Sequence, residues 1–113
     1  MPCLFCEIVA GRIPAKVAYQ DDHVMAFHDI SPQAPTHTLI IPKRHITSLL
    51  DLTPEDDAMV GLLVRKARDL AKLAGIDESG FRLVFNAGED AGYSVYHIHL
   101  HLVGGRKLGW PPG

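Results

Sequence analysis

Three histidines alternate with aliphatic residues between positions 96 and 103. This period of two is typical of a strand with one polar and one apolar face, so His97, His99 and His101 are predicted to share a face. At this spacing, neighbours on a strand lie about 6.7 Å apart and the outer pair about 13 Å apart. The three imidazoles therefore cannot all bind one metal at the ~2 Å of a zinc–nitrogen bond, whereas two neighbours can converge on a phosphate group.

The chemistry that suits such a pair is phosphoryl transfer, which needs a nucleophile and donors for the phosphate oxygens. Imidazole has an ordinary pKa of about 6.5, so much of it is neutral and nucleophilic at pH 7. His99 has a histidine on either side and is the best candidate nucleophile, with His101 as a donor to the phosphate. Asn86 and Ser94 lie at the end of one segment and the approach to the next, and can add neutral donors.

A second group of metal-binding residue types begins at Cys3 and Cys6, which have the C-x2-C spacing of half a zinc site. His45, and the triad histidine His97 that is not needed at phosphorus, are candidates for the two further ligands. Two other interpretations stay open: apolar cysteines in the first turn of a helix, or a thioredoxin-like redox pair. The redox pair is disfavoured because no strand precedes it. We therefore hypothesise a structural zinc ion.

The rest of the chain predicts an antiparallel sheet with two helices. A short helix is expected over residues 3–11, and a long one from Thr53, a candidate cap followed by proline, to Gly75. The loop 29–35 contains two prolines and follows a strand, a common place for ligand contacts. Successive strands with short links and one long helix indicate an α+β fold with one face of the sheet covered. The predicted strands are 17–20, 24–28, 38–42, 81–86 and 96–103.

Composition excludes several classes of protein. The 113 residues, 47% of them apolar and 21% charged, suit one globular domain. A net charge of −2 gives no basic field for nucleic acid, and no apolar run approaches the ~20 residues that span a bilayer. Two cysteines are too few for a disulfide framework, and residues 1–6 do not resemble a secretory signal. We therefore expect a cytoplasmic protein that binds neither nucleic acid nor membrane.

With these residues assembled, the sequence resembles the histidine triad (HIT) family, and within it the Hint branch of purine nucleoside phosphoramidases. The family signature, in which histidines alternate with hydrophobic residues, is matched at 97–103. Similarity runs over nearly the whole chain, through 27–37, 41–45, 104–106 and the Trp-Pro-Pro-Gly ending at 110–113. The resemblance implies a single HIT domain over residues 1–113, with a five-stranded antiparallel half-sheet, one long helix and a short N-terminal helix.

By this resemblance the activity is hydrolysis of a purine nucleoside phosphoramidate, such as adenosine monophosphate joined through a P–N bond to an amine or a lysine. His99 would attack the α-phosphorus to give a nucleotidyl-histidine that water hydrolyses. His101 would hold phosphate oxygens, His37 would support the cluster, and Asp29 would accept from the ribose hydroxyls. The residues that would surround the rest of the substrate are Ile8, Phe27, His28 and Ile30 at the purine, and Asn86, Ser94 and Val95 on the phosphate and leaving-group side.

The resemblance also implies an assembly and a metal. Family members are typically homodimers in which two half-sheets join into one continuous sheet and the tail lies near the partner's active site, which gives Trp110 a role in trans. Bacterial relatives carry the cysteine pair and bind zinc with two histidines. This agrees with a site made of Cys3, Cys6, His45 and His97, and no organic cofactor is expected.

The chain departs from the family pattern at Ala91-Gly92-Tyr93, where Hint proteins usually read Gly-Gly-Gln, and three competing functions stay open. Tyr93 stands where Hint proteins usually carry glutamine, beside the leaving-group site, so leaving-group preference is expected to differ. A dinucleoside polyphosphate hydrolase is the first competing function, whereas the transferase branch is disfavoured because it carries glutamine at the position of His101. The second is a nucleotide-binding regulatory module, and the third is a metal-handling protein that uses the seven histidines and two cysteines.

Overall fold

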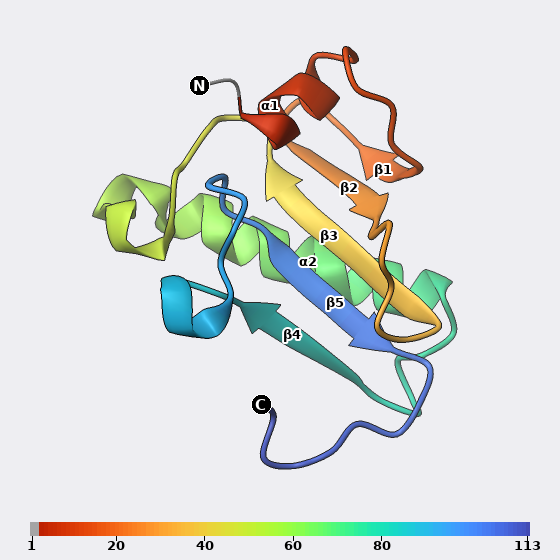
Figure 1. The fold of residues 1–113 in the computed structure, drawn as a ribbon. Helices are drawn as coiled ribbons and strands as arrows, with labels where there is room; N and C mark the ends of the chain where they lie inside the picture. The colour runs from red at the N-terminus through yellow and green to blue at the C-terminus, as the bar shows by residue number, and fades with distance from the viewer. Residues whose placement is uncertain (1–2) are drawn as a thin grey trace.

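The computed structural model describes residues 3–113, so the first two residues of the expected domain lie outside it. Five antiparallel strands form one sheet in the order β1-β2-β3-β5-β4. The long helix α2 crosses one face of this sheet, and the short helix α1 lies at one corner of the other (Figure 1). The predicted α+β fold is confirmed. Its strands are β1 (Val17–Gln20), β2 (Val24–His28), β3 (Thr36–Pro42), β4 (Phe81–Phe85) and β5 (Leu100–Gly104), and its helices are α1 (Leu4–Val9) and α2 (Asp57–Leu73), with 3₁₀ turns at Leu49–Asp51, Pro54–Asp56 and Glu89–Ala91.

Helix α2 forms where the sequence predicts it. The backbone N–H of Thr53 donates to the carboxylate of Asp56 (2.9 Å), and Pro54 opens the 3₁₀ turn that leads into the helix. Just beyond the helix, Gly75 has φ +73°, a left-handed conformation that glycine adopts without strain. Within residues 3–113, no helix combines the length and the apolar character needed to cross a membrane. The side chains that α2 buries are Leu63, Ala67 and Ala71.

The face of the sheet opposite α2 has a second, smaller core under α1. Phe5 and Ile8 lie three residues apart, on one side of this helix, and pack with Phe27, Leu39 and other strand residues. The sequence predicted a sheet covered on one face only, so the cover that α1 gives to a corner of the second face is a correction. The uncovered remainder of that face is where the histidines gather.

Strand β5 is shorter than predicted, because it begins at Leu100 rather than at residue 96. The neighbouring strand β3 ends at Pro42, which has no N–H to extend the ladder. The chain before β5 bonds elsewhere: the N–H of Ile98 donates to the carbonyl of Ile46 (2.7 Å). Only His101 of the triad therefore lies in the sheet, and the prediction of one strand face shared by all three histidines is wrong.

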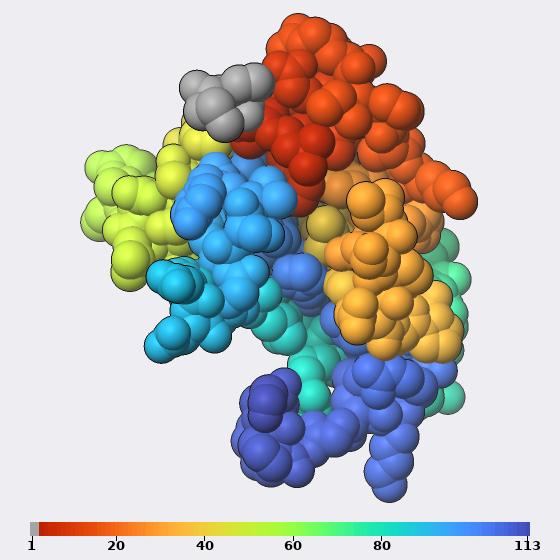
Figure 2. All heavy atoms as spheres, in the orientation of Figure 1, coloured from red at the N-terminus to blue at the C-terminus, as the bar shows by residue number. Residues whose placement is uncertain are grey.

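Strand β4 lies at the edge of the sheet, so one of its sides is unpaired within residues 3–113. The C-terminal tail turns back toward this strand, and Arg82 donates to the carbonyl of Gly109 (2.9 Å). In the space-filling view the tail forms an arm that leaves a hollow beside β4 (Figure 2).

Candidate active site

Three histidines from two segments meet on the face opposite α2. His37 lies in β3 and His101 in β5, and these two strands are neighbours in the sheet. His99 lies one residue before β5, and the centroid of its ring is 5.0 Å from that of His101. Nε2 of His37 lies 2.9 Å from Nδ1 of His101, so the three rings form one continuous cluster.

Hydrogen bonds assign the protons on two of these rings. The N–H of Gln33 donates to Nδ1 of His37 (3.1 Å), so the proton of His37 is on Nε2. This Nε2–H of His37 donates to Nδ1 of His101. A carboxylate oxygen of Asp29 lies 3.5 Å from Nε2 of His37. His101 therefore carries its proton on Nε2, a buried atom that has no hydrogen-bond partner within residues 3–113. A buried donor without a partner is costly, which makes this N–H a natural contact for a ligand oxygen.

The ring of His99 has the opposite arrangement. Its Nδ1 lies 2.8 Å from the carbonyl of His97, an acceptor, so Nδ1 carries the proton and donates to that oxygen. The lone pair of His99 is therefore on Nε2. The site thus places a nucleophilic nitrogen on His99 beside a free N–H on His101, which is the combination that attack on a phosphoryl group requires.

Burial favours the neutral form of His99 and of His101. It lowers the pKa of His99 below the ordinary value, against the opposing effect of the hydrogen bond to His97. Burial, together with the neighbouring His99 and His37, lowers the pKa of His101 to about 4. At pH 7 His99 therefore keeps its nucleophilic lone pair, and His101 is a neutral donor.

Acidification is expected to destabilise the fold through His101. Because its pKa in the folded chain, about 4, is below the ordinary 6.5, the unfolded chain takes up a proton first as the pH falls. Its contribution to stability is complete above about pH 6.5 and is lost progressively toward about pH 4. Urea unfolding across this range should show a smaller decline in free energy of unfolding for His101→Gln than for wild type. A decline of equal size would contradict the assignment, and His23→Gln, at an exposed turn, is the matched control.

A groove of about 680 Å³ opens beside His37 and Asp29. Two other residues predicted at the purine, His28 and Ile30, line the same groove, and Ile30 is 97% exposed. An isoleucine with so much free surface offers an apolar contact for a planar ring. The structure therefore brings together four of the predicted site residues around one open groove.

This groove is not lined by the other two predicted purine contacts, Ile8 and Phe27, nor by Val95, which was predicted on the phosphate and leaving-group side. Ile8 and Phe27 are buried in the core under α1, and Val95 packs against the same core. Ala15, which packs against this core, lines the groove, whereas these three side chains do not.

The residues predicted on the phosphate and leaving-group side are dispersed, and Trp110, which was predicted to act in a partner's site, also lies away from the groove. Asn86 and Trp110 line the separate hollow beside β4, and Trp110 is 81% exposed. Ser94 is exposed in the loop before the triad. Within one chain, the structure does not bring Asn86 and Trp110 to the groove of Asp29.

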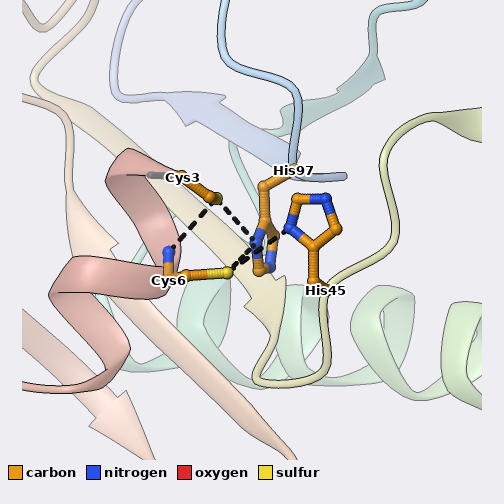
Figure 3. Close-up of side chains that lie close together, drawn as sticks. All are labelled: Cys3, Cys6, His45 and His97. Carbon is orange, nitrogen blue, oxygen red and sulfur yellow. Dashed lines mark hydrogen bonds between the residues drawn. The ribbon is translucent and has the colours of Figure 1, made fainter. Parts of the chain in front are cut away.

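Two cysteines and two histidines form a compact cluster beside α1 (Figure 3). Their donor atoms all lie within 4.8 Å of one another. Nδ1 of His97 lies 3.3 Å from Sγ of Cys3 and 3.5 Å from Sγ of Cys6. Nδ1 of His45 lies 3.4 Å from Sγ of Cys6. All four residues predicted as metal ligands are therefore together, although they come from three separate segments.

The donor set fits a tetrahedral zinc ion. Zinc–sulfur bonds of about 2.3 Å and zinc–nitrogen bonds of about 2.0–2.1 Å, at tetrahedral angles, place sulfur and nitrogen ligands about 3.5 Å apart. The three contacts span 3.3–3.5 Å. His97 donates its Nε2–H to the carbonyl of Pro42 (2.8 Å), which leaves the Nδ1 lone pair facing the sulfurs. Burial and the adjacent Cys3 thiol raise the pKa of Cys6 to about 11, so a nearby cation is what would convert it to a thiolate.

Two aromatic residues pack against the triad histidines, although no sequence pattern predicted this role. Phe5 packs edge-on against the rings of both His97 and His99, with centroid distances of 6.0 and 5.1 Å. Tyr93 stacks on His99 at 5.6 Å. In the sequence, Phe5 is an ordinary apolar residue of a short helix. Tyr93 had one signal, its departure from the usual glutamine.

Comparison with known proteins supports a family assignment. The family model described as HIT domain matches residues 10–108. Purine nucleoside phosphoramidase of Escherichia coli K12 is 47% identical over 106 residues, which cover 94% of this chain and 89% of that protein. An uncharacterised HIT-like protein of Synechocystis is 47% identical over 110 residues, which cover 97% of this chain and 96% of that protein.

Solved structures share the fold. A HIT family hydrolase from Legionella pneumophila superposes with a TM-score of 0.98 at 51% identity, covering 99% of this chain and 100% of that chain. A histidine triad protein from Clostridium difficile superposes with a TM-score of 0.92 at 41% identity, covering 96% of this chain and 95% of that one. The resemblance read from the sequence is confirmed, and this chain belongs to the histidine triad (HIT) family.

Proposed function

We propose that this chain is a hydrolase that cleaves the P–N bond of purine nucleoside phosphoramidates through a nucleotidyl-histidine on His99. The observation that carries the proposal is the free lone pair on Nε2 of His99 beside the free N–H on Nε2 of His101. The 47% identity to the E. coli protein named purine nucleoside phosphoramidase supports the same reaction class.

The reaction has two steps. Nε2 of His99 gives its electron pair to the α-phosphorus and forms a new N–P bond. The P–N bond to the amine breaks, and the amine leaves with the electron pair of that broken bond and a proton from water. Nδ1–H of His99 stays bonded to the carbonyl of His97, so the nucleotidylated ring carries one positive charge. Water then attacks the phosphorus, the bond to His99 breaks, and the nucleoside monophosphate leaves as a proton returns to solvent.

The neighbouring residues stabilise the phosphoryl group. His101 donates Nε2–H to a non-bridging oxygen, where negative charge develops during attack. His37 fixes that proton on the outer nitrogen by donating to Nδ1 of His101. Asn86 and Ser94 are proposed as further donors on the leaving-group side.

The groove beside the histidines seats the nucleoside. One carboxylate oxygen of Asp29 accepts the N–H of Ser31 (2.8 Å), which fixes the carboxylate at the end of β2. We assign Asp29 to the ribose hydroxyls, and His28 and the exposed Ile30 to the purine. Ile8 and Phe27 lie in the core against which Val95 and the groove residue Ala15 pack.

We further propose that the cluster of Cys3, Cys6, His45 and His97 holds one zinc ion. With four protein ligands and no open position, zinc there would supply structural cross-linking rather than reaction chemistry. The four ligands would tie α1 to the loop after β3 and to the segment that carries the triad.

We also propose a homodimer in which a second copy adds its strand to the free edge of β4. The edge is unpaired within residues 3–113, and Trp110 on the adjacent tail is 81% exposed, available to a partner's site. Light scattering at micromolar concentration is expected to give twice the mass of one chain. The mass of a single chain at that concentration would contradict the proposal.

Product analysis on two substrates tests the proposed reaction. Adenosine 5′-phosphoramidate should yield adenosine monophosphate and ammonia in equal amounts, with kcat/KM at least about tenfold above that for a diadenosine polyphosphate. Faster cleavage of the dinucleotide would support the polyphosphate hydrolase. Tight nucleotide binding without turnover of either compound would instead support the regulatory module.

A further inference from the structure

His99, the proposed nucleophile, contacts two buried aromatic rings. Phe5 meets the ring of His99 edge-on, with centroids 5.1 Å apart and planes at 83°. Tyr93 lies nearly parallel to the same ring, with centroids 5.6 Å apart and planes at 21°. Phe5 is 5% exposed and Tyr93 6%, so both rings lie inside the protein. The ring of Tyr93 therefore packs against His99 inside the protein and does not form an open surface for a leaving group.

The ring of Tyr93 is itself fixed. Its hydroxyl donates to the carbonyl of Thr47 (2.5 Å), in the loop that follows β3. Burial raises the pKa of Tyr93 to about 12, so the phenol stays protonated and keeps this bond at neutral pH. Tyr96 packs edge-on against the ring, with centroids 5.2 Å apart. The ring of Tyr93 that stacks on His99 is thus fixed by one hydrogen bond and one aromatic contact.

The stack favours one charge state of His99. In the proposed reaction the ring becomes cationic when Nε2 bonds to phosphorus, because Nδ1 keeps its proton on the carbonyl of His97. A cation within about 6 Å of the face of a tyrosine ring is attracted by the ring quadrupole, and more strongly in a desolvated site. The stack therefore opposes the penalty that burial places on positive charge at His99.

We propose that Tyr93 is a positioning residue that fixes the His99 ring and stabilises its cationic, phosphorus-bonded form. The proposal rests on the proposed function, because it concerns the covalent step of that reaction. The electron pair of Nε2 forms the N–P bond, the P–N bond to the amine breaks, and the amine takes a proton from water. Tyr93 exchanges no atom or electron in this step.

A series of variants at position 93 separates charge stabilisation from packing. We expect Tyr93→Leu to slow single-turnover formation of the nucleotidyl-histidine about tenfold, with substrate affinity within about threefold of wild type. Tyr93→Phe, which keeps the face and loses the bond to Thr47, should stay within about threefold. Phenylalanine analogues with one, two or three fluorines have a similar shape, but the negative potential on the face of the ring decreases with each fluorine. The rate should fall along that series. A flat rate along the series, or a wild-type rate in Tyr93→Leu, would overturn the proposal.

Tyr19→Leu is the matched control, since Tyr19 is also a tyrosine but packs against the core on the α2 side of the sheet, opposite the triad. Its rate should equal that of wild type. Thermal unfolding of each variant identifies any that fails to fold, and the fluorinated series then decides the result, because its packing is preserved.

Inorganic phosphoramidate, a small phosphoryl donor, keeps this inference independent of the nucleotide substrate. Mass spectrometry of phosphorylated His99 should show the same order of rates in the same variants. Absence of nucleotide turnover in wild type would remove the proposed function, whereas the order of phosphorylation rates would still decide the role of Tyr93. Equal phosphorylation rates in wild type and Tyr93→Leu would remove that role even if the nucleotide reaction is confirmed.

Discussion

Replacing His99 with alanine is expected to lower kcat for phosphoramidate hydrolysis by about 10⁴-fold or more, because the variant lacks the nitrogen that we propose bonds to phosphorus. The adjacent His101 cannot take over this role, since its outer nitrogen carries the proton and its Nδ1 accepts from His37. The groove residues Asp29 and Ile30 are unchanged, so affinity for adenosine monophosphate should stay within about threefold. Steady-state kinetics with both products quantified, and calorimetry with the nucleotide, measure the two effects.

Two companion variants sharpen this result. His101→Ala keeps the nucleophile and removes the free N–H, so we expect a smaller loss of about 10²–10³-fold in kcat. His23→Ala, at an exposed turn far along the chain from the triad, should leave kcat unchanged. Turnover by His99→Ala within tenfold of wild type would exclude His99 as the nucleophile, and a larger loss in His101→Ala than in His99→Ala would reverse the two roles.

The sequence predicted most of the fold because local signals and tertiary packing agree along most of the chain. Thr53, Pro54 and Gly75 are local signals for the bounds of the long helix, and the helix ends where they predict. The start of β5 was missed because it depends on a distant residue. A strand that began at residue 96 would need a partner strand that continued beyond Pro42. The alternation of polar and apolar residues at 96–103 contains no information about a proline in another segment.

The site shows the same division between residue types and geometry. Cys3, Cys6 and the histidines could be predicted from types that have specific chemistry, and the structure brings those residues together. The proton positions could not be predicted, because they depend on backbone groups: the N–H of Gln33 and the carbonyl of His97. Every residue except proline has the same backbone N–H and C=O groups, so the sequence does not indicate which of them will bond to a histidine ring.

His97 connects the proposed zinc-binding cluster with His99, the proposed nucleophile. Its Nδ1 faces the cysteines, its Nε2 is bonded to Pro42, and its carbonyl accepts from Nδ1 of His99. Phe5, on the same helix as Cys6, packs against the rings of both histidines. Any change that moves α1 away from His97 therefore loosens two of the contacts that orient His99.

Removing zinc is expected to lower the melting temperature by about 15 °C. Zinc at 1,000 times its dissociation constant adds about 4 kcal/mol of stability, and each kcal/mol shifts the melting temperature of a chain this size by about 4 °C. Elemental analysis should find one zinc per chain, and thermal unfolding with and without a strong chelator measures the shift. Cys6→Ser should hold less zinc and respond less to the chelator, whereas Glu7→Gln, the neighbouring substitution on the same helix, should behave as wild type.

Loss of zinc should also slow the reaction at His99, because His97 belongs both to the cysteine–histidine cluster and to the triad. Zinc-free protein that remains folded below its melting temperature should form the nucleotidyl-histidine about tenfold more slowly, with the loss reversed when zinc is restored. An unchanged melting temperature after complete removal of zinc would show that the four side chains pack well as thiols and imidazoles alone. Several zinc ions per chain would favour a metal-handling function, since the Cys3, Cys6, His45 and His97 cluster accounts for only one.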